Sequence, residues 1–477
     1  MLRPLLAVIS FCISQAFVGA QAPPPGFTYQ TVTDNALSQA SSMAFAPDGR
    51  LFVCERSTGN IRIVWDGALL PGNWATVPCA NNPSSEHGLL GIAIDPEFLL
   101  NGFVYVYYTT ADQMQNRIAR IQDTGAVGVG FTILSPANAI PTGAATKHSG
   151  GRMVFGRDGT LFIGTGDRFV SSTAPSLTTW NGKVLRFEVP NLTIPANNPF
   201  PGSPIFSYGH RNQFGITVRP ATGDVYQAEL GDLLADEINR IVAGGNYGWP
   251  TYEGLEPIPN PNTVDPIAVY SAPTPDPAGC CFYSGTIYPA SYHGSLFWVE
   301  FTEGKVRKVD LDAAGTTVLS QSIFDDLVHA FDIQMGPDGN LWVLHTDNVG
   351  ARGADEIGRY VFTAEPNPGI QVMAVSNRVI GGAMTIGMRA NVGDLVFCWV
   401  SLGSFPSPVP TPFGPLWVPL DLLVSANLIW ADGRAYFPFS LPNHPIFTGI
   451  ELFTQGARFD PVGALASTAN FDSIVMW

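Results

Sequence analysis

The chain has 477 residues, with 24 Lys and Arg against 39 Asp and Glu, and therefore a net charge of -15. This acidic balance gives nucleic-acid phosphates no basic surface to bind, so it excludes nucleic acid as a partner. The 50 glycines and 40 prolines interrupt many short apolar segments. That composition favours an all-β protein, and the length favours more than one domain.

The first 20 residues have the pattern of an export signal. Arg3 is followed by an apolar stretch from Leu5 to Phe17 and then by the small residues Gly19 and Ala20. We expect residues 1–20 to be a cleaved signal peptide and the mature chain to be secreted or periplasmic. The apolar stretch is too short to span a membrane, and no later segment is long and apolar enough, so the sequence predicts no transmembrane segment.

A short pattern recurs six times: an apolar strand, a Pro, Asp or Gly turn, and a second apolar strand. Each copy predicts a β-hairpin. Successive copies begin 49, 61, 63, 70 and 47 residues apart, at Met43, Ile92, Met153, Ile216, Thr286 and Ile333. This spacing is typical of a propeller blade of about four strands. The sequence therefore predicts a six-bladed β-propeller over residues 30–365, with a central channel as its natural pocket.

Residues 370–477 contain no further copy of the repeat and few charges. We expect a small C-terminal β domain of sandwich-like form, joined to the propeller by the turn-rich PNPG at 366–369. Its Trp399, Trp417 and Trp430 could form a sugar-stacking surface, but core positions are favoured for aromatic residues in a small sandwich.

Five cysteines remain after the predicted signal peptide. Cys54 and Cys79 are a plausible disulfide across the first blade, and an oxidising compartment would support it. Cys280 and Cys281 are adjacent in a Pro- and Gly-rich segment that we expect to be a loop at the channel mouth. They could form a vicinal disulfide or pair elsewhere, while no histidine lies at the spacing that a zinc site needs.

Two polar clusters precede predicted inner strands of neighbouring blades. His148 lies in the glycine-rich HSGGR, where it could act as a general base or could simply be held by the backbone. His210, Arg211 and Asn212 lie in SYGHRNQFG, the corresponding segment of the next blade. We expect both clusters to project into the channel at the same level.

A third cluster, from Ala228 to Pro250, is acidic. Its oxygen donors could complete a calcium shell, although acidic loops are more often only solvated. The donors are Glu229, Asp232, Asp236, Glu237 and the carbonyl of Gly231. The GGNYGWP that follows is interpreted as a structural turn whose Tyr247 and Trp249 pack between blades.

Four motifs occur in a fixed order: EHGLLGIAIDP from Glu86, HSGGRMVFGRDGTLFIGTGDR from His148, GHRNQFG from Gly209 and DEINRIVAGGNYGWP from Asp236. With these motifs, residues 42–362 resemble the glucose/sorbosone dehydrogenase family, which are soluble six-bladed quinoproteins that include the aldose sugar dehydrogenases. The resemblance implies pyrroloquinoline quinone (PQQ), held in the channel by a calcium ion, and a small sugar as substrate.

The resemblance also implies roles for individual residues. His148 matches the catalytic base, which removes the proton of the substrate hydroxyl while hydride passes to the quinone. Arg211 matches the arginine that faces the reacting quinone oxygen. Asn212 matches a cofactor contact, and Glu86 stands where some members have glutamine. The implied calcium positions are Gly231 and Asp232 for the cofactor's ion, and Asp236, Glu237 and Tyr247 for a second, structural ion.

The sequence departs from the family at two places. Lys147 precedes His148 where the well-known glucose enzymes carry aspartate, so a carboxylate that would orient the base is expected to be missing. The lysine and two arginines that clamp the cofactor's carboxylates align with Thr302, His329 and Phe331, while Lys305, Arg307 and Arg352 are possible substitutes.

Three functions compete at this point. The first is a quinone-dependent dehydrogenase that oxidises an aldose or similar hydroxyl and passes electrons to an unidentified acceptor. The second is a non-catalytic module that binds a glycan or protein, as hedgehog-interacting relatives of this propeller do. The third is a calcium-dependent lactonase on a similar propeller. The motifs favour the dehydrogenase.

Overall fold

The structure is a computed structural model that describes residues 22–363, apart from residues 144, 272–274, 286, 328 and 347–354, together with the strands between residues 371 and 475. Residues 1–20, Arg352, Trp417 and Trp430 lie outside the described residues, so the predictions made for them stay predictions.

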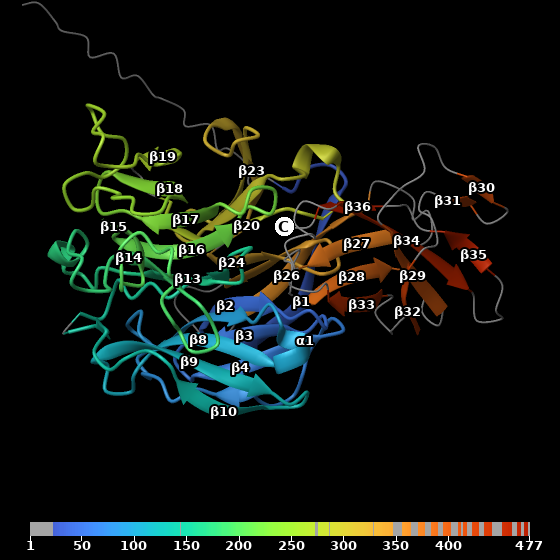
Figure 1. The fold of residues 1–477 in the computed structure, drawn as a ribbon, viewed down its shortest axis with the longest axis horizontal. Helices are drawn as coiled ribbons and strands as arrows, with labels where there is room; N and C mark the ends of the chain where they lie inside the picture. The colour runs from blue at the N-terminus through green and yellow to red at the C-terminus, as the bar shows by residue number, and fades with distance from the viewer. Residues whose placement is uncertain are drawn as a thin grey trace, which may run out of the picture.

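Six sheets form the propeller that the repeat predicts (Figure 1). The first three blades are β2 (Ala40–Phe45), β3 (Leu51–Glu55), β4 (Asn60–Trp65), β5 (Ala68–Leu69) and β6 (Ala75–Thr76); β7 (Leu89–Ile94), β8 (Phe103–Thr109), β9 (Gln115–Asp123), β10 (Gly128–Ile133) and β11 (Ile140–Pro141); and β12 (Met153–Phe155), β13 (Leu161–Thr165), β14 (Lys183–Phe187) and β15 (Ile205–Tyr208).

The other three blades have four strands each. They are β16 (Asn212–Val218), β17 (Val225–Leu230), β18 (Ala235–Ile241) and β19 (Ala268–Ser271); β20 (Pro277–Phe282), β21 (Leu296–Glu300), β22 (Lys305–Leu311) and β23 (Val318–Asp326); and β24 (Ala330–Met335), β25 (Leu341–Thr346), β26 (Asp355–Phe362) and β1 (Phe27–Leu37). The short helix α1 (Phe98–Asn101) and the 3-10 turns at Ser171–Thr173 and Ala290–Tyr292 lie between strands.

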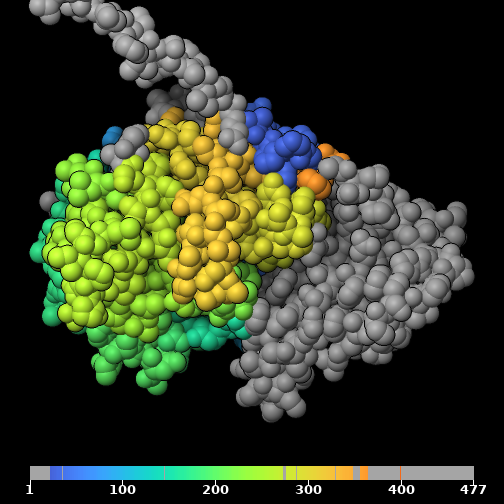
Figure 2. Space-filling model, turned by 90° about the horizontal axis from the view of Figure 1, so that it is seen from above, coloured from blue at the N-terminus to red at the C-terminus, as the bar shows by residue number. Residues whose placement is uncertain are grey.

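The first strand of the chain closes the ring. β1 pairs antiparallel with β26, so that Phe27 lies opposite Phe362 and Tyr29 opposite Tyr360. In Figure 2 the blue N-terminal residues accordingly lie at the surface near the orange residues of the last blade. Joining the two ends in one sheet removes the exposed edges that an open ring would leave.

The inner strand of each blade contacts the inner strands of its neighbours around the ring, from β2 through β7, β12, β16 and β20 to β24 and back. The segments that precede these strands therefore meet at one end of the propeller axis. His148 precedes β12, and Arg211 precedes β16, so the two polar clusters are brought to the same end, as the repeat predicts.

The fifth predicted hairpin was placed wrongly. Its first strand is not the apolar stretch that begins at Thr286 but β20, which pairs with β21 so that Cys281 lies opposite Phe297. The segment between the two strands contains a 3-10 turn. The prediction failed because β20 begins with Pro277 and contains Gly279, residues that normally argue against a strand.

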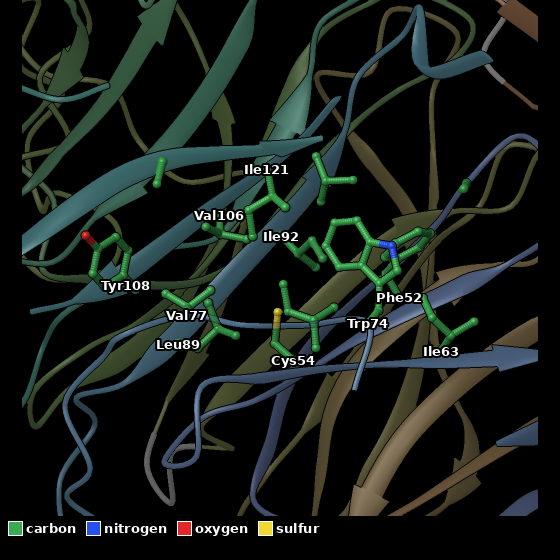
Figure 3. Close-up of a cluster of buried hydrophobic side chains, with 14 of the residues drawn as sticks. Phe52, Cys54, Ile63, Trp74, Val77, Leu89, Ile92, Val106, Tyr108 and Ile121 are labelled. Carbon is green, nitrogen blue, oxygen red and sulfur yellow. The ribbon is translucent and has the colours of Figure 1, made fainter. Parts of the chain in front are cut away.

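Apolar side chains fill the spaces between blades. Between the first and second blades, Phe52, Trp74, Leu89 and Val106 pack in one buried cluster (Figure 3). Cys54 belongs to the same cluster, and Figure 3 shows its sulfur among carbon side chains. Burial of these apolar surfaces is the main source of stability in such a fold.

The expected disulfides do not form. Cys54, Cys79, Cys280, Cys281 and Cys398 are free thiols, and no disulfide joins the described residues. Cys280 and Cys281 do not lie in a loop but are buried on β20, where successive side chains point to opposite faces of the sheet. Burial raises the pKa of Cys79 to about 11, so this thiol is held neutral as an apolar group.

Beyond the propeller the described strands form further β-sheets, in agreement with the predicted β domain. One sheet contains β27 (Gln371–Ser376), β28 (Ala383–Arg389) and β33 (Arg434–Ser440). A second contains β32 (Leu422–Leu428), β29 (Leu395–Ser401), β34 (Glu451–Phe459), β35 (Leu465–Thr468) and β36 (Asp472–Val475), and β30 (Val409–Thr411) pairs with β31 (Gly414–Leu416). The predicted limits of the propeller, at residue 365, and of the C-terminal domain, at residue 370, remain predictions.

None of the helices described is long and apolar enough to cross a membrane.

Candidate active site

The loop that carries His148 has an unusual backbone. His148 adopts a φ of 56°, in the left-handed region that non-glycine residues rarely occupy. Gly150 and Gly151 follow with φ of 60° and 110°. A side chain at Gly166 would collide with the carbonyl of His148. The glycines thus let this loop lie directly against the segment that follows β13, and strain of this kind is common at functional sites.

That close approach forms a buried histidine–aspartate pair. His148 Nδ1 lies 2.7 Å from Asp167 Oδ1, and the two residues are 5% and 1% exposed. The carboxylate can accept only from a protonated nitrogen, so the pair places the ring proton on Nδ1. Nε2 makes no hydrogen bond to any described residue. The imidazole is therefore oriented with its basic nitrogen available to a ligand.

Asp167 also ties the neighbouring loops together. Its Oδ2 accepts from Trp249 Nε1 at 2.8 Å, and its backbone N–H donates to the carbonyl of Arg211 at 2.7 Å. The expectation that a carboxylate partner is missing is therefore wrong. Lys147 is exposed and takes no part in this contact, and the carboxylate comes from the segment that follows the second strand of the same hairpin. Trp249, expected to pack between blades, also donates to this carboxylate from the loop that follows the next blade's third strand.

Glu86 and Asn212 lie against the His148 loop, while their predicted contact with a cofactor stays a prediction. The backbone N–H of His148 donates to Glu86 Oε2 at 2.6 Å, and Asn212 Nδ2 lies 3.4 Å from the same oxygen. The N–H of Gly150 donates to Asn212 Oδ1 at 3.3 Å. Residues from three blades thus hold the His148 loop in place.

Arg211 and Asp232 are also brought together, as an ion pair. Arg211 Nη2 donates to Asp232 Oδ1 at 2.7 Å, and Nη1 donates to the carbonyl of Leu230 at 3.2 Å. The guanidinium lies 5.4 Å from the centre of the Trp249 ring. Its Nε is buried and has no hydrogen-bond partner within the described ranges. The guanidinium is thus held in place by Asp232, Leu230 and the Trp249 ring.

His210, unlike His148, is enclosed by protein on both ring nitrogens. Nδ1 contacts Glu229 Oε2 at 2.9 Å, and Nε2 contacts Ser207 Oγ at 2.8 Å. Its ring stacks on Tyr247 with the centroids 4.5 Å apart, and the Tyr247 hydroxyl donates to the carbonyl of Arg240 at 2.5 Å. These residues support the fold between β17, β18 and the loop at 242–249.

Most of the predicted calcium residues are buried, namely Gly231, Asp236, Glu237 and Tyr247, whereas Asp232 is exposed. Asp236 accepts backbone N–H groups from Gly231 and Asp276 at 2.8 and 2.9 Å, and Glu237 accepts from Gly254 at 2.6 Å. Burial, with the negative charge of Glu229 beside it, raises the pKa of Glu237 well above its ordinary value. No group of three or more acidic, His or Cys side chains is placed to hold a metal in the described part of the chain. Calcium stays a prediction.

A cavity of about 240 Å³ lies on the propeller axis beside this cluster. Residues of five inner strands and of the His148 loop line it, including Ala40, Leu90, Gly150, Phe214, Ala278 and Phe331. The ion pair between Arg152 and Asp332, 2.8 Å apart, lies deeper along the axis. The channel that the propeller predicts thus contains a cavity at the end that carries His148.

The residues at the predicted clamp positions do not supply cations to this cavity. Phe331 lines it together with Phe301. His329 Nδ1 donates to the carbonyl of Phe301 at 2.7 Å, and Thr302 donates to Asp276. The proposed substitutes Lys305 and Arg307 lie on β22 and pair with carboxylates of their own blade. The three carboxylates of PQQ therefore do not fit this cavity, although Arg211 and Asn212 suit the quinone oxygens.

A closed six-bladed propeller with a buried histidine and other polar side chains at one end of its axis is the architecture expected of a sugar dehydrogenase-like protein. The family model described as Glucose / Sorbosone dehydrogenase matches residues 37–353, and the chain belongs to this family.

Similar proteins agree with this assignment. An uncharacterised protein of Synechocystis is 30% identical over 69% of this chain and 86% of its own length. The aldose sugar dehydrogenase of Escherichia coli is 26% identical over 71% of this chain and 94% of its own. Among solved structures, the PQQ-bound aldose sugar dehydrogenase of Streptomyces coelicolor is 28% identical, with a TM-score of 0.60 over 71% of this chain and 99% of that one.

Proposed function

We propose that the protein is an oxidoreductase that oxidises a hydroxyl group of an aldose or similar polyol, with His148 as the general base. The contact between His148 and Asp167 carries this proposal, because it fixes a buried imidazole with one nitrogen free for substrate. Family membership supports the sugar substrate. The predicted signal peptide would place the reaction outside the cytoplasm.

Each residue of the cluster has a defined part in proton removal. His148 Nε2 accepts the hydroxyl proton as hydride leaves the same carbon, and positive charge develops on the ring. Asp167 stabilises that charge through Nδ1 and keeps the ring in the required tautomer. Arg211 and Asn212 offer donors to an oxygen that gains negative charge.

The test is turnover with a panel of aldoses and polyols, a quinone and a redox dye. Replacing His148 with Ala should lower kcat by about 10²–10⁴-fold, the usual contribution of a positioned general base. His293→Ala is the matched control, since His293 is exposed and its ring contacts Tyr288 and Tyr283 rather than the His148 cluster. Full turnover in His148→Ala would contradict the assigned role.

A second function is favoured by one observation. The positions predicted to clamp the carboxylates of PQQ supply no cation to the cavity, so the fold could serve as a binding module for a glycan or protein. In that case no sugar would reduce any acceptor, while a glycan or protein would bind saturably to the axial end. The lactonase alternative needs calcium, and calcium-dependent lactone hydrolysis without quinone would support it instead.

A further inference from the structure

We infer that the cavity beside His148 binds an uncharged planar quinone rather than a carboxylate-bearing one. The inference deepens the proposed function, because it names the class of electron acceptor that this site would use. Its binding test does not depend on sugar oxidation, so the two can fail separately.

The charges around the cavity exclude a polyanionic ligand. Among the described residues, four charged side chains line it, two arginines and two carboxylates: Arg56, Arg152, Glu86 and Asp276. Arg152 pairs with Asp332 just below. The lining thus has no net positive charge, because its two arginines are balanced by two carboxylates, and a tricarboxylate would lose its hydration without an excess of cations to replace it.

The wall opposite the His148 loop is aromatic and apolar. Phe301 and Phe331 lie with their ring centroids 5.0 Å apart and their planes tilted by 43°. Phe214 and Leu90 add further apolar surface from β16 and β7. A flat, uncharged ring system can pack against such rings without desolvating a charge. At about 240 Å³ the cavity is smaller than the roughly 300–1,000 Å³ of drug-sized pockets, so it suits a compact ring system.

The polar edge of the cavity suits a carbonyl oxygen. Leu230, which lines the cavity, accepts a hydrogen bond from Arg211, so the guanidinium lies at its edge. Arg211 Nε is buried and unpaired among the described residues. Gly150 lines the cavity too and contacts Asn212. A quinone presents an acceptor oxygen at the rim of an otherwise apolar ring, which matches this division into a polar edge and an aromatic wall.

The reaction then balances. The substrate carbon loses its hydrogen as hydride, with two electrons, and the hydroxyl loses its proton to His148 Nε2, so the alcohol becomes a carbonyl. The quinone receives the hydride with its two electrons and then the proton that His148 Nε2 had taken up, so it leaves as the hydroquinone and the imidazole is neutral again. No other oxidant is needed until the quinone is used again.

Direct binding tests the inference. We would titrate the purified full-length chain with 1,4-naphthoquinone and, separately, with PQQ in a calorimeter, with and without calcium. We expect saturable binding of naphthoquinone and at least tenfold weaker binding of PQQ under both conditions. Tighter binding of PQQ than of naphthoquinone, or no binding of naphthoquinone, would overturn the inference.

Replacing Phe331 sharpens the test. Phe331→Arg should weaken naphthoquinone about tenfold and strengthen PQQ, because it exchanges an aromatic face for a cation. Phe331→Leu should weaken naphthoquinone without any gain for PQQ, and it guards against a failure of the arginine variant to fold. Val129→Arg, at a 44% exposed position on β10, is the control and should change neither affinity. Equal behaviour of all three variants would overturn the assignment of the site.

Turnover then separates the two proposals. Naphthoquinone binding with no reduction by any sugar would support the cavity's ligand class and contradict the dehydrogenase function. Sugar oxidation that proceeds with PQQ but not with naphthoquinone would support the function and overturn the inference.

Discussion

Two buried histidine–carboxylate pairs lie in neighbouring blades, and they differ in whether the second ring nitrogen of the histidine has a hydrogen-bond partner. His148 contacts Asp167 at 2.7 Å, and His210 contacts Glu229 at 2.9 Å. The second nitrogen of His210 is taken by Ser207, whereas that of His148 has no partner among the described residues. The same chemistry therefore stabilises the fold in one blade and offers a base in the other, and burial alone does not distinguish the two roles.

The largest effect that would separate the pairs is on turnover. Asp167→Asn should lower kcat by roughly 10³–10⁴-fold, because an amide cannot keep the same His148 tautomer while it accepts from Trp249. Glu229→Gln is the matched change in the other pair and should leave the kcat of folded protein nearly unchanged. Steady-state kinetics would measure both, and equal losses in the two variants would remove the distinction.

The next largest effect is on stability, and here the His210 pair should matter more than the His148 pair. His210→Ala should lower the free energy of unfolding by about 3 kcal/mol, because it leaves the buried Glu229 carboxylate without this partner. His148→Ala should lower it by less, since its loop is also held by Glu86 through the backbone. Urea unfolding followed by tryptophan fluorescence would show this, and a greater loss for His148→Ala would contradict the comparison.

A smaller effect concerns how Asp167 is held. Trp249→Phe keeps the ring but removes the N–H that donates to Asp167 Oδ2. A hydrogen bond to a charged group contributes about 1.5–3 kcal/mol, so kcat should fall by roughly 10- to 100-fold. Trp74→Phe, in the core between the first two blades, is the control and should cost stability rather than kcat. Unchanged kinetics in Trp249→Phe would show that Asp167 needs no such support.

The smallest expected effect is a pH dependence beside the His210 pair. Because the folded state raises the pKa of Glu237, it holds a proton that the unfolded chain releases above about its ordinary pKa of 4.5. The free energy of unfolding of calcium-free protein should therefore fall as the pH rises above about 4.5. The loss should be at most about 1.4 kcal/mol per pH unit, and it should stop once the carboxyl of the folded protein also ionises. Glu237→Gln should flatten this slope in melting experiments at several pH values.

Calcium sharpens the same experiment. If Glu237 binds calcium as the family resemblance implies, added calcium should raise the melting temperature most at high pH, where the ion replaces the proton. Glu237→Gln should then lose that response. A calcium response that is independent of both pH and Glu237 would contradict the predicted structural site.

The sequence predicts the fold well where alternation is local. Met43 to Glu55 and Ile333 to Thr346 alternate around short turns, and each forms the hairpin that this pattern predicts. The fifth blade fails because Pro277 and Gly279 disguise its inner strand, while the apolar stretch from residue 286 imitates one. The alternation of apolar residues and the turn residues are local features. They cannot reveal a strand that becomes the inner strand of its blade through contacts with neighbouring blades.

The site is predicted only in part for a similar reason. Glu86, His148, Arg211 and Asn212 stand in recognisable motifs, and they come together. Asp167 also stands in one of these motifs, within GTGD, but its role depends on the geometry of the β12–β13 hairpin. His148 lies just before β12 and Asp167 lies just after β13, so the two residues meet at the same end of this hairpin. Local sequence is enough to predict that meeting. It is not enough to predict the pairing of Trp249 with Asp167, because this contact joins different blades.

The closure of the ring has a consequence for how the protein folds. Thr31 donates to Glu356, 325 residues further along the chain, and every blade is held between these two ends. The growing chain cannot complete its last sheet until β26 has been made, so β1 must wait, unpaired, for nearly the whole propeller. Contacts between such distant residues slow folding. A chain stopped before β26 would therefore leave β1 as an unpaired edge, and the loops of His148 and Arg211 would lack a closed ring to hold them together.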